Sequence, residues 1–92
     1  MIESIRHKAL ERLYEDDDGS RLAPDMIGRI RLILSTLDAA EVVEAMNQPT
    51  FRLHPLKGGR KGSWAVTVRA NWRIVFRFQD GKAFDVDLVD YH

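Results

Sequence analysis

The residues of this chain that could do chemistry gather in its second half, where basic side chains accumulate with no acids between them. Residues 52–77 contain seven lysines and arginines and no aspartate or glutamate. His54 lies inside this run, and Tyr91 follows close to the end of the sequence. Groups of these types can cut RNA without a metal. A base takes the proton of the ribose 2′-hydroxyl, an acid protonates the leaving 5′-oxygen, and cations stabilise the phosphate as charge builds on it.

Each of these side chains suits one step of such a reaction. Histidine can serve as base or acid because its free pKa is about 6.5. Arg73 could present two donors in a fork to a phosphate, and Tyr91 could stack on an RNA base. Each also has a purely structural interpretation. His54 would then be a polar residue at a strand end, Lys57 a solvated loop residue, and Arg73 an ordinary outward-facing residue of a strand.

Charge is unevenly divided along the chain. Residues 1–50 carry 6 basic and 10 acidic side chains, whereas residues 51–92 carry 8 basic and 4 acidic, so a net charge of zero conceals halves of −4 and +4. This asymmetry indicates an anionic partner for the second half, although a solvated surface fits it equally well. The chain has no cysteine, which excludes disulfides and a cysteine nucleophile. No motif resembles zinc ligands or a phosphate-binding glycine loop, so we expect no metal and no cofactor.

Length and hydropathy predict a small globular protein. Ninety-two residues, 45% of them apolar and 30% charged, are typical of a single domain that spans residues 1–92. No apolar run approaches the roughly 18 residues of a membrane span. The first residues lack the apolar segment of a signal peptide. We therefore expect a cytoplasmic location and no contact with a membrane.

The periodicity of apolar residues changes along the chain. Helical spacing covers residues 5–14 and 26–37, and Asp38 with Glu41 resembles a capping pair for a third short helix that ends near Asn47. After Pro49 the period becomes two, which predicts strands near residues 51–54, 64–69, 72–78 and 84–89. Helices followed by a strand meander predict an α+β fold. The N-terminal helices would pack on one face of a C-terminal, mainly antiparallel sheet.

Three-residue turns between the last strands give a consistent register. A turn at residues 80–82 predicts the cross-strand pairs Phe78–Phe84, Phe76–Val86 and Ile74–Leu88 on the core face, and Arg77–Asp85 and Arg73–Val89 on the other face. A similar turn at residues 69–71 places Thr67 beside Arg73. Five side chains are then expected on the face that the helices leave uncovered, which we call the open face: Arg52, His54, Arg73, Arg77 and Tyr91. Lys57 follows in the loop that leaves this face.

Three stretches of the sequence together resemble the HigB toxins, which belong to the plasmid-maintenance branch of the RelE/ParE superfamily of bacterial toxins. They are Leu53–Gly58, Val66–Ile74 and Val89–His92. The resemblance extends over essentially the whole chain and implies a RelE-like fold. It implies a ribosome-dependent mRNA endoribonuclease that enters the A site of the 70S ribosome and cuts the codon there by metal-independent 2′-hydroxyl attack. The implied partner is a HigA-type helix-turn-helix antitoxin, through which alone the toxin would associate with operator DNA.

The resemblance also implies roles for individual residues. His54 and Lys57 match the family's histidine and lysine of the basic pocket, and Arg73 matches the arginine that stabilises the transition state. Tyr91 matches the C-terminal tyrosine that positions the cut nucleotide, and its neighbours match residues that support proton transfer: Asp90 and His92. We expect further RNA contacts from four basic side chains: Arg52, Arg60, Lys61 and Arg77. The sequence leaves the base and the acid unassigned, with His54 or His92 favoured for proton transfer.

Two other functions are compatible with the same sequence. A ParE-like inhibitor of DNA gyrase would share the fold without nuclease activity, and a plain RNA- or ribosome-binding module would need only the basic surface. A gyrase inhibitor has no chemical need to keep His54, Lys57, Arg73 and Tyr91 together, and a binding module needs no proton-transfer groups. The set of four therefore favours the nuclease.

Overall fold

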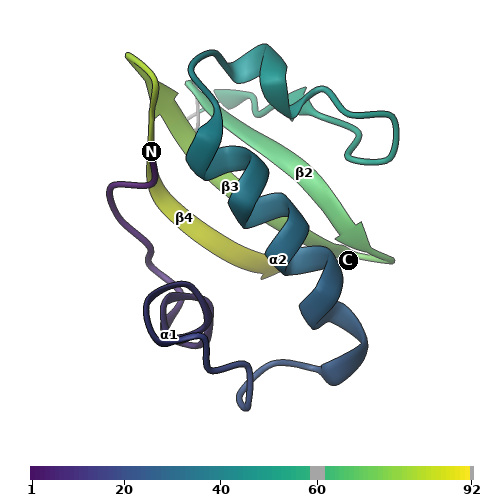
Figure 1. The fold of residues 1–92 in the computed structure, drawn as a ribbon. Coiled ribbons are helices and arrows are strands. Elements are labelled where there is room, and N and C mark those ends of the chain that lie inside the picture. The colour runs from purple at the N-terminus through teal and green to yellow at the C-terminus, as the bar shows by residue number, and fades with distance from the viewer. Residues whose placement is uncertain (59–61, 92) are drawn as a thin grey trace.

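A computed structural model, which describes residues 1–58 and 62–91, shows two helices followed by a four-stranded sheet. The helical elements are α1 (Lys8–Asp16), α2 (Pro24–Ala39) and the short 3-10 helix η1 (Val43–Met46). The strands are β1 (His54–Pro55), β2 (Ser63–Arg69), β3 (Trp72–Gln79) and β4 (Lys82–Asp90). They lie side by side in the order β1-β2-β3-β4, and every neighbouring pair is antiparallel. Both long helices lie on one side of the sheet, and α2 crosses it diagonally (Figure 1). The predicted α+β architecture is confirmed.

The core fills the space between the helices and the sheet. Pro24 starts α2, where its missing N–H costs no helical hydrogen bond. His7 caps α1, because its Nδ1 accepts from the backbone N–H of Leu10 at 3.3 Å. The apolar residues spaced three and four apart on the helices meet the alternate residues of β2, β3 and β4. The largest fully buried side chains include Leu10, Ile30, Ile33, Leu37, Ile74 and Phe76.

The predicted third short helix is present as the 3-10 helix η1, whose C-cap is Asn47, but the capping pair predicted for it is wrong. Helix α2 continues through Asp38, and only the single 3-10 turn of η1 follows. The Asp38 carboxylate instead accepts hydrogen bonds from the Ile2 backbone N–H at 2.9 Å and the Tyr14 hydroxyl at 2.8 Å. It therefore ties the N-terminal segment and α1 to α2. The Ile2 bond lowers the pKa of Asp38, and burial together with the Asp38 bond raises the pKa of Tyr14 to about 12.

Replacing Asp38 with alanine is expected to lower the free energy of unfolding by about 1–3 kcal/mol near neutral pH, because two donors lose a charged acceptor. Glu41→Ala serves as the matched control and should stay within about 0.5 kcal/mol, since Glu41 is exposed. The folded-state pKa of Asp38 is depressed. Its stabilisation is therefore present above the unfolded value of about 3.9 and is lost as the pH falls through the folded value. Urea denaturation between pH 2 and 7 measures this, and a pH-independent difference between the two proteins would contradict it.

The N-terminal segment covers the outer edge of β4. It runs parallel to that strand through the pairs Ile2–Ala83 and Ile5–Val86. The N-terminal segment and β4 lie side by side at the left of the sheet in Figure 1. The Ser4 hydroxyl also accepts a hydrogen bond from the Asp85 N–H at 2.8 Å. An edge satisfied in this way is protected from pairing with another chain.

Both hairpins close with two-residue turns, where three residues were predicted. Gln79 pairs with Lys82 and Arg69 pairs with Trp72, so each turn is one residue shorter. A bulge in each hairpin then restores the predicted pairs Thr67–Arg73, Ile74–Leu88 and Arg73–Val89. Near the β3–β4 turn the prediction is wrong, because Phe78 pairs with Ala83 and Arg77 with Phe84. Asp85 lies at that bulge with φ of 53°, a conformation that aspartate tolerates better than most residues.

Candidate active site

Two rows of paired residues cross the open face of the sheet. One row runs from His54 through Ala65 and Val75 to Asp87, and the next joins Thr67, Arg73 and Val89. Ala65 and Val75 are 0% and 9% exposed although the helices pack against the opposite face. The row that starts at His54 thus has an apolar middle with polar residues at both ends. This places His54 and Arg73 on the same face, as predicted.

His54 stands at the edge of the sheet in the two-residue strand β1. Its side chain is exposed, and its Nδ1 lies 3.0 Å from the carbonyl oxygen of Arg52. A carbonyl can only accept a hydrogen bond, so this contact requires the proton on Nδ1. In the neutral ring the other nitrogen, Nε2, then keeps its lone pair. A ring held in this way can accept a proton through Nε2.

Arg73 is half-buried near the start of β3, close to the β2–β3 turn. Its Nη1 donates to the carbonyl oxygens of Ala70 at 2.6 Å and Trp72 at 3.1 Å. These bonds turn the guanidinium toward the turn and away from His54. The two Cα atoms lie roughly 12 Å apart, because two strand spacings and two residues separate them. A substrate would therefore lie between the two side chains.

Arg77 lies on the same face but is already paired. Its Nε donates to the Asp85 carboxylate at 2.9 Å, and its guanidinium lies 5.2 Å from the centre of the Phe84 ring. The predicted Arg77–Asp85 contact is thus present, although the bulge makes Phe84 the backbone partner. Both side chains are about half exposed, at 48% and 44%. Exposed pairs of this kind stabilise a protein by only about 0–1 kcal/mol, so a phosphate can displace the carboxylate.

Three further predicted residues are described by the structure: Lys57, Tyr91 and Asp90. Lys57 is exposed after β1, and Tyr91 directly follows the last residue of β4. The Tyr91 backbone N–H donates to Asn71 at 2.8 Å. Asp90 pairs with Trp72 and so belongs to the helical side of the sheet, where Trp72 packs against the core. Three predicted site residues lie outside the described part of the chain: Arg60, Lys61 and His92.

The strand alternation on which the placement of Arg52 was predicted does not reach Arg52. Arg52 precedes β1 and has a left-handed φ of 54°, so strand alternation does not put its side chain on the open face. Phe51, the residue before it, has its ring in the core, and its carbonyl accepts from the Thr67 N–H at 2.7 Å. The chain therefore turns sharply between Phe51 and His54. What Arg52 supplies in this structure is the carbonyl that meets the His54 ring.

Sequence reasoning missed Arg29, which supports this turn from α2. Its two terminal nitrogens donate to Thr50 Oγ1 at 2.7 Å, the Thr50 carbonyl at 2.6 Å and the Thr67 carbonyl at 3.0 Å. The signal in the sequence was its spacing, three residues after Met26 and four before Ile33, which puts a cation on the flank of the core-facing stripe.

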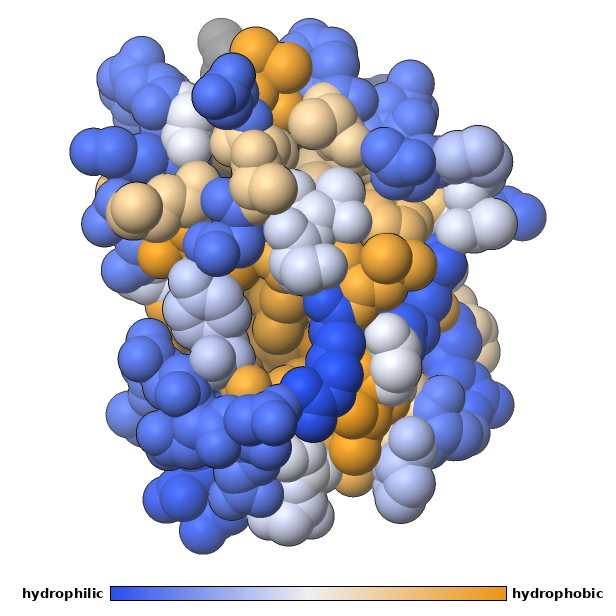
Figure 2. Space-filling model, in the orientation of Figure 1, coloured by the Kyte–Doolittle hydropathy of each residue, from blue (hydrophilic) through white to orange (hydrophobic). Residues whose placement is uncertain are grey.

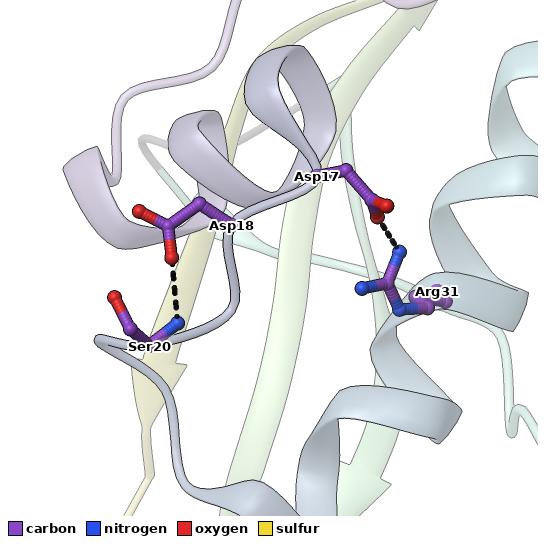
Figure 3. A network of polar contacts seen from close by, with 4 residues as sticks. All are labelled: Asp17, Asp18, Ser20 and Arg31. Atoms are coloured by element: carbon purple, nitrogen blue, oxygen red, sulfur yellow. Dashed lines mark hydrogen bonds and ion pairs between the residues drawn. The ribbon is translucent and has the colours of Figure 1, made fainter.

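A separate hollow of about 360 Å³ lies on the helical side, between α1 and α2. Figure 2 shows its apolar floor between the polar surfaces of the two helices. Arg31 on α2 reaches Asp17 across its rim, beside the turn in which Asp18 accepts from the Ser20 N–H (Figure 3). Its lining contains no histidine or lysine, and none of the predicted site residues. It is therefore distinct from the candidate site. Among residues 1–58 and 62–91, no three acidic, histidine or cysteine side chains form a group that could hold a metal ion.

Some known proteins are similar to this chain in sequence, and others are similar to it in fold. It is 42% identical to the Endoribonuclease HigB of Proteus vulgaris over the full length of both proteins. It is 33% identical to the Toxin HigB-1 of Vibrio cholerae over 90 residues, which are 96% of this chain and 95% of that protein. The crystal structure of YafQ from Escherichia coli aligns with a TM-score of 0.66 at 13% identity, covering 98% of this chain and 91% of YafQ. The YoeB dimer from Staphylococcus aureus aligns with a TM-score of 0.62 at 15% identity, covering 99% and 94%.

The family match covers nearly the whole sequence. Residues 3–92 match the family described as the RelE-like toxin HigB of type II toxin–antitoxin systems. The match includes both helices and all four strands, and with them every residue of the candidate site. The chain therefore belongs to the HigB family of RelE-like toxins.

Proposed function

We propose that this HigB toxin, an endoribonuclease, cuts mRNA in the A site of the 70S ribosome and so stops translation in the cytoplasm. The observation that carries the proposal is that His54 and Arg73 lie in neighbouring rows on one open face of the sheet. One offers a proton acceptor and the other a cation, and the apolar residues Ala65 and Val75 lie in the row that starts at His54. Its full-length relative from Proteus vulgaris is named an endoribonuclease, which supports the same activity here.

We assign the steps of the reaction from the chemical properties of these groups. His54 Nε2 takes the proton of the 2′-hydroxyl, whose oxygen forms a bond to the adjacent phosphorus. The bond from phosphorus to the 5′-oxygen breaks, leaving a cyclic phosphate and a 5′-hydroxyl. Arg73 and Lys57 stabilise the charge that builds on the phosphate oxygens. The proton for the leaving oxygen comes from the C-terminal group, Tyr91 or His92, and Tyr91 also positions the base.

The predicted site residues His54, Lys57 and Arg77 are exposed, which supports dependence on the ribosome. An exposed surface binds flexible RNA in many orientations, whereas fixing the reacting atoms can contribute about 7–11 kcal/mol to lowering the barrier. The ribosome holds the A-site codon in one place and supplies that orientation. The further basic residues expected to contact the RNA backbone are Arg52, Arg60, Lys61 and Arg77. A gyrase inhibitor would have no use for the Nε2 of His54 held as a proton acceptor.

The deciding experiment maps new 5′ ends on a defined mRNA with purified ribosomes and the purified toxin. We expect cuts inside the A-site codon, cyclic phosphate and 5′-hydroxyl termini, and far slower cutting of the same RNA without ribosomes. Absence of cuts by a folded protein, together with early arrest of DNA replication in cells, would support the gyrase alternative. Ribosome binding without cuts would support a plain binding module.

The partner that neutralises the toxin is an antitoxin, as expected for a type II system. A YoeB–YefM complex from Staphylococcus aureus shares the fold, with a TM-score of 0.61 over all of this chain. We propose that the partner here is of the HigA type, with a helix-turn-helix domain that carries the complex to operator DNA. Adding it to the cleavage assay should suppress the cuts. Operator DNA should be retarded by the complex and not by the toxin alone.

A further inference from the structure

The turn that leads into β1 depends on a guanidinium from the helical layer of the fold. Arg29 lies on α2, is half-buried, and holds three acceptors on two segments that are distant in sequence. Its guanidinium carbon also lies 5.1 Å from the centre of the Phe51 ring. A planar group with several fixed donors can satisfy acceptors in this way, which a lysine ammonium cannot do with the same geometry.

The contact with Thr67 shows that Arg29 takes the place of a hydrogen-bond donor from a neighbouring strand. In an antiparallel ladder, the N–H and the carbonyl of one residue point to the same neighbouring strand. The Thr67 N–H donates toward that side, to Phe51 at 2.7 Å. Its carbonyl finds no strand residue there, because β1 comprises only His54 and Pro55, and it accepts from Arg29 at 3.0 Å instead. Arg29 thus completes the sheet edge where the strand is missing.

The hydrogen bonds from Arg29 also set the conformation of Arg52. Thr50 and Phe51 are fixed on one side by Arg29 and β2, and His54 is fixed on the other by pairing with Ala65. Arg52 spans the gap with φ of 54°, which costs a residue with a side chain about 1–2 kcal/mol and persists only where both flanks are held. In that conformation the Arg52 carbonyl points to the His54 ring, at 3.0 Å from Nδ1.

We propose that Arg29 is a positioning residue for RNA cleavage, which holds residues 50–52 so that the Arg52 carbonyl keeps the proton of His54 on Nδ1 and leaves Nε2 open to the substrate. The proposal rests on the role of His54 in the proposed function. The Nε hydrogen of Arg29 is buried with no acceptor among the described residues. The three hydrogen bonds of the terminal nitrogens of Arg29 offset the cost of this unsatisfied donor. Arg29 touches no reacting atom, so its effect passes entirely through the turn.

The test compares Arg29→Met with Arg31→Met as the matched control. Arg31 lies on the same helix, and its guanidinium pairs with Asp17 on the rim of the helical hollow, remote from β1. The first readout is the ring nitrogen spectrum of His54 at a pH where the ring is neutral. We expect the Nδ1-protonated tautomer to dominate in the wild type and in Arg31→Met, and a mixture of tautomers in Arg29→Met.

The second readout is cleavage on ribosomes. Arg29→Met should lower kcat by about 10- to 100-fold, the usual range for a residue that positions another, with KM nearly unchanged. Thr50→Val, which removes only the Oγ1 acceptor and threatens the fold less, should show a smaller loss of activity and a smaller change of tautomer in the same direction. An unchanged tautomer in both variants would overturn the proposal, whatever the activity. If His54 has no role in cleavage, a His54 variant will keep full activity. The effect of Arg29 on the tautomer would still be measured independently, so the two failures can be distinguished.

Discussion

Replacing Arg73 with alanine is expected to lower the rate of ribosome-dependent cleavage by about 100- to 1,000-fold, the usual cost of removing one donor that stabilises transition-state charge. The loss should fall on kcat, because the charge that Arg73 meets develops during the reaction. In the free protein its Nη1 is engaged by the carbonyls of Ala70 and Trp72. Those bonds fix the plane of the guanidinium close to the β2–β3 turn. The measurement is the single-turnover rate of cleavage at saturating toxin, monitored through the appearance of new 5′ ends on a defined mRNA.

Arg69→Ala is the matched control for this variant. Arg69 ends β2, is exposed, and pairs with Asp25 at the start of α2, so its charge belongs to the helical side. We expect its cleavage rate to change by less than about threefold, in line with the small energies of exposed ion pairs. Equal losses in both variants would mean that general positive charge drives binding. Arg73 would then lose its assigned place at the phosphate.

The sequence correctly predicted the part of the open face on β2, β3 and β4, because strand alternation is insensitive to how a hairpin closes, provided that a bulge restores the pairing. Thr67, Arg73 and Val89 were placed in one row, and they lie in one row. The turn lengths were wrong because alternation alone does not register a compensating bulge. At Asp85 the bulge is stabilised by the Ser4 hydroxyl, which belongs to a segment more than 80 residues away along the chain. Such a contact has no local signature in the sequence.

The part of the site that the sequence did not predict is the turn before β1. The alternation of Phe51, Arg52, Leu53 and His54 is typical of a strand, and it predicted Arg52 on the open face. The buried Phe51 ring and the bonds to Arg29 override that local preference and put Arg52 into a left-handed conformation. Tertiary contacts of this kind decide the backbone where a strand is only two residues long, since its ladder bonds are too few to do so.

Replacing His54 with asparagine or with glutamine is expected to lower the cleavage rate by about 100- to 10,000-fold, the contribution usual for a positioned proton acceptor. The asparagine amide can still donate to the Arg52 carbonyl as Nδ1 does, but it offers no base in place of Nε2. Both variants should therefore be slow, and Asn should fold with the turn intact. A His54→Asn protein that cuts at the wild-type rate would reduce His54 to a structural partner of Arg52.

The direction of the proton transfer is tested with an mRNA whose leaving 5′-oxygen at the A-site codon is replaced by sulfur. A thiolate departs without a proton, so the defect of a variant that lacks the acid is relieved with this substrate, and the defect of a variant that lacks the base is retained. With its Nδ1 proton directed at Arg52, a neutral His54 has only the Nε2 lone pair to offer the substrate, and lone pairs accept protons. We therefore expect His54→Asn to stay slow with the sulfur substrate. Recovery to the wild-type rate would assign His54 as the acid and leave the base to the C-terminal residues.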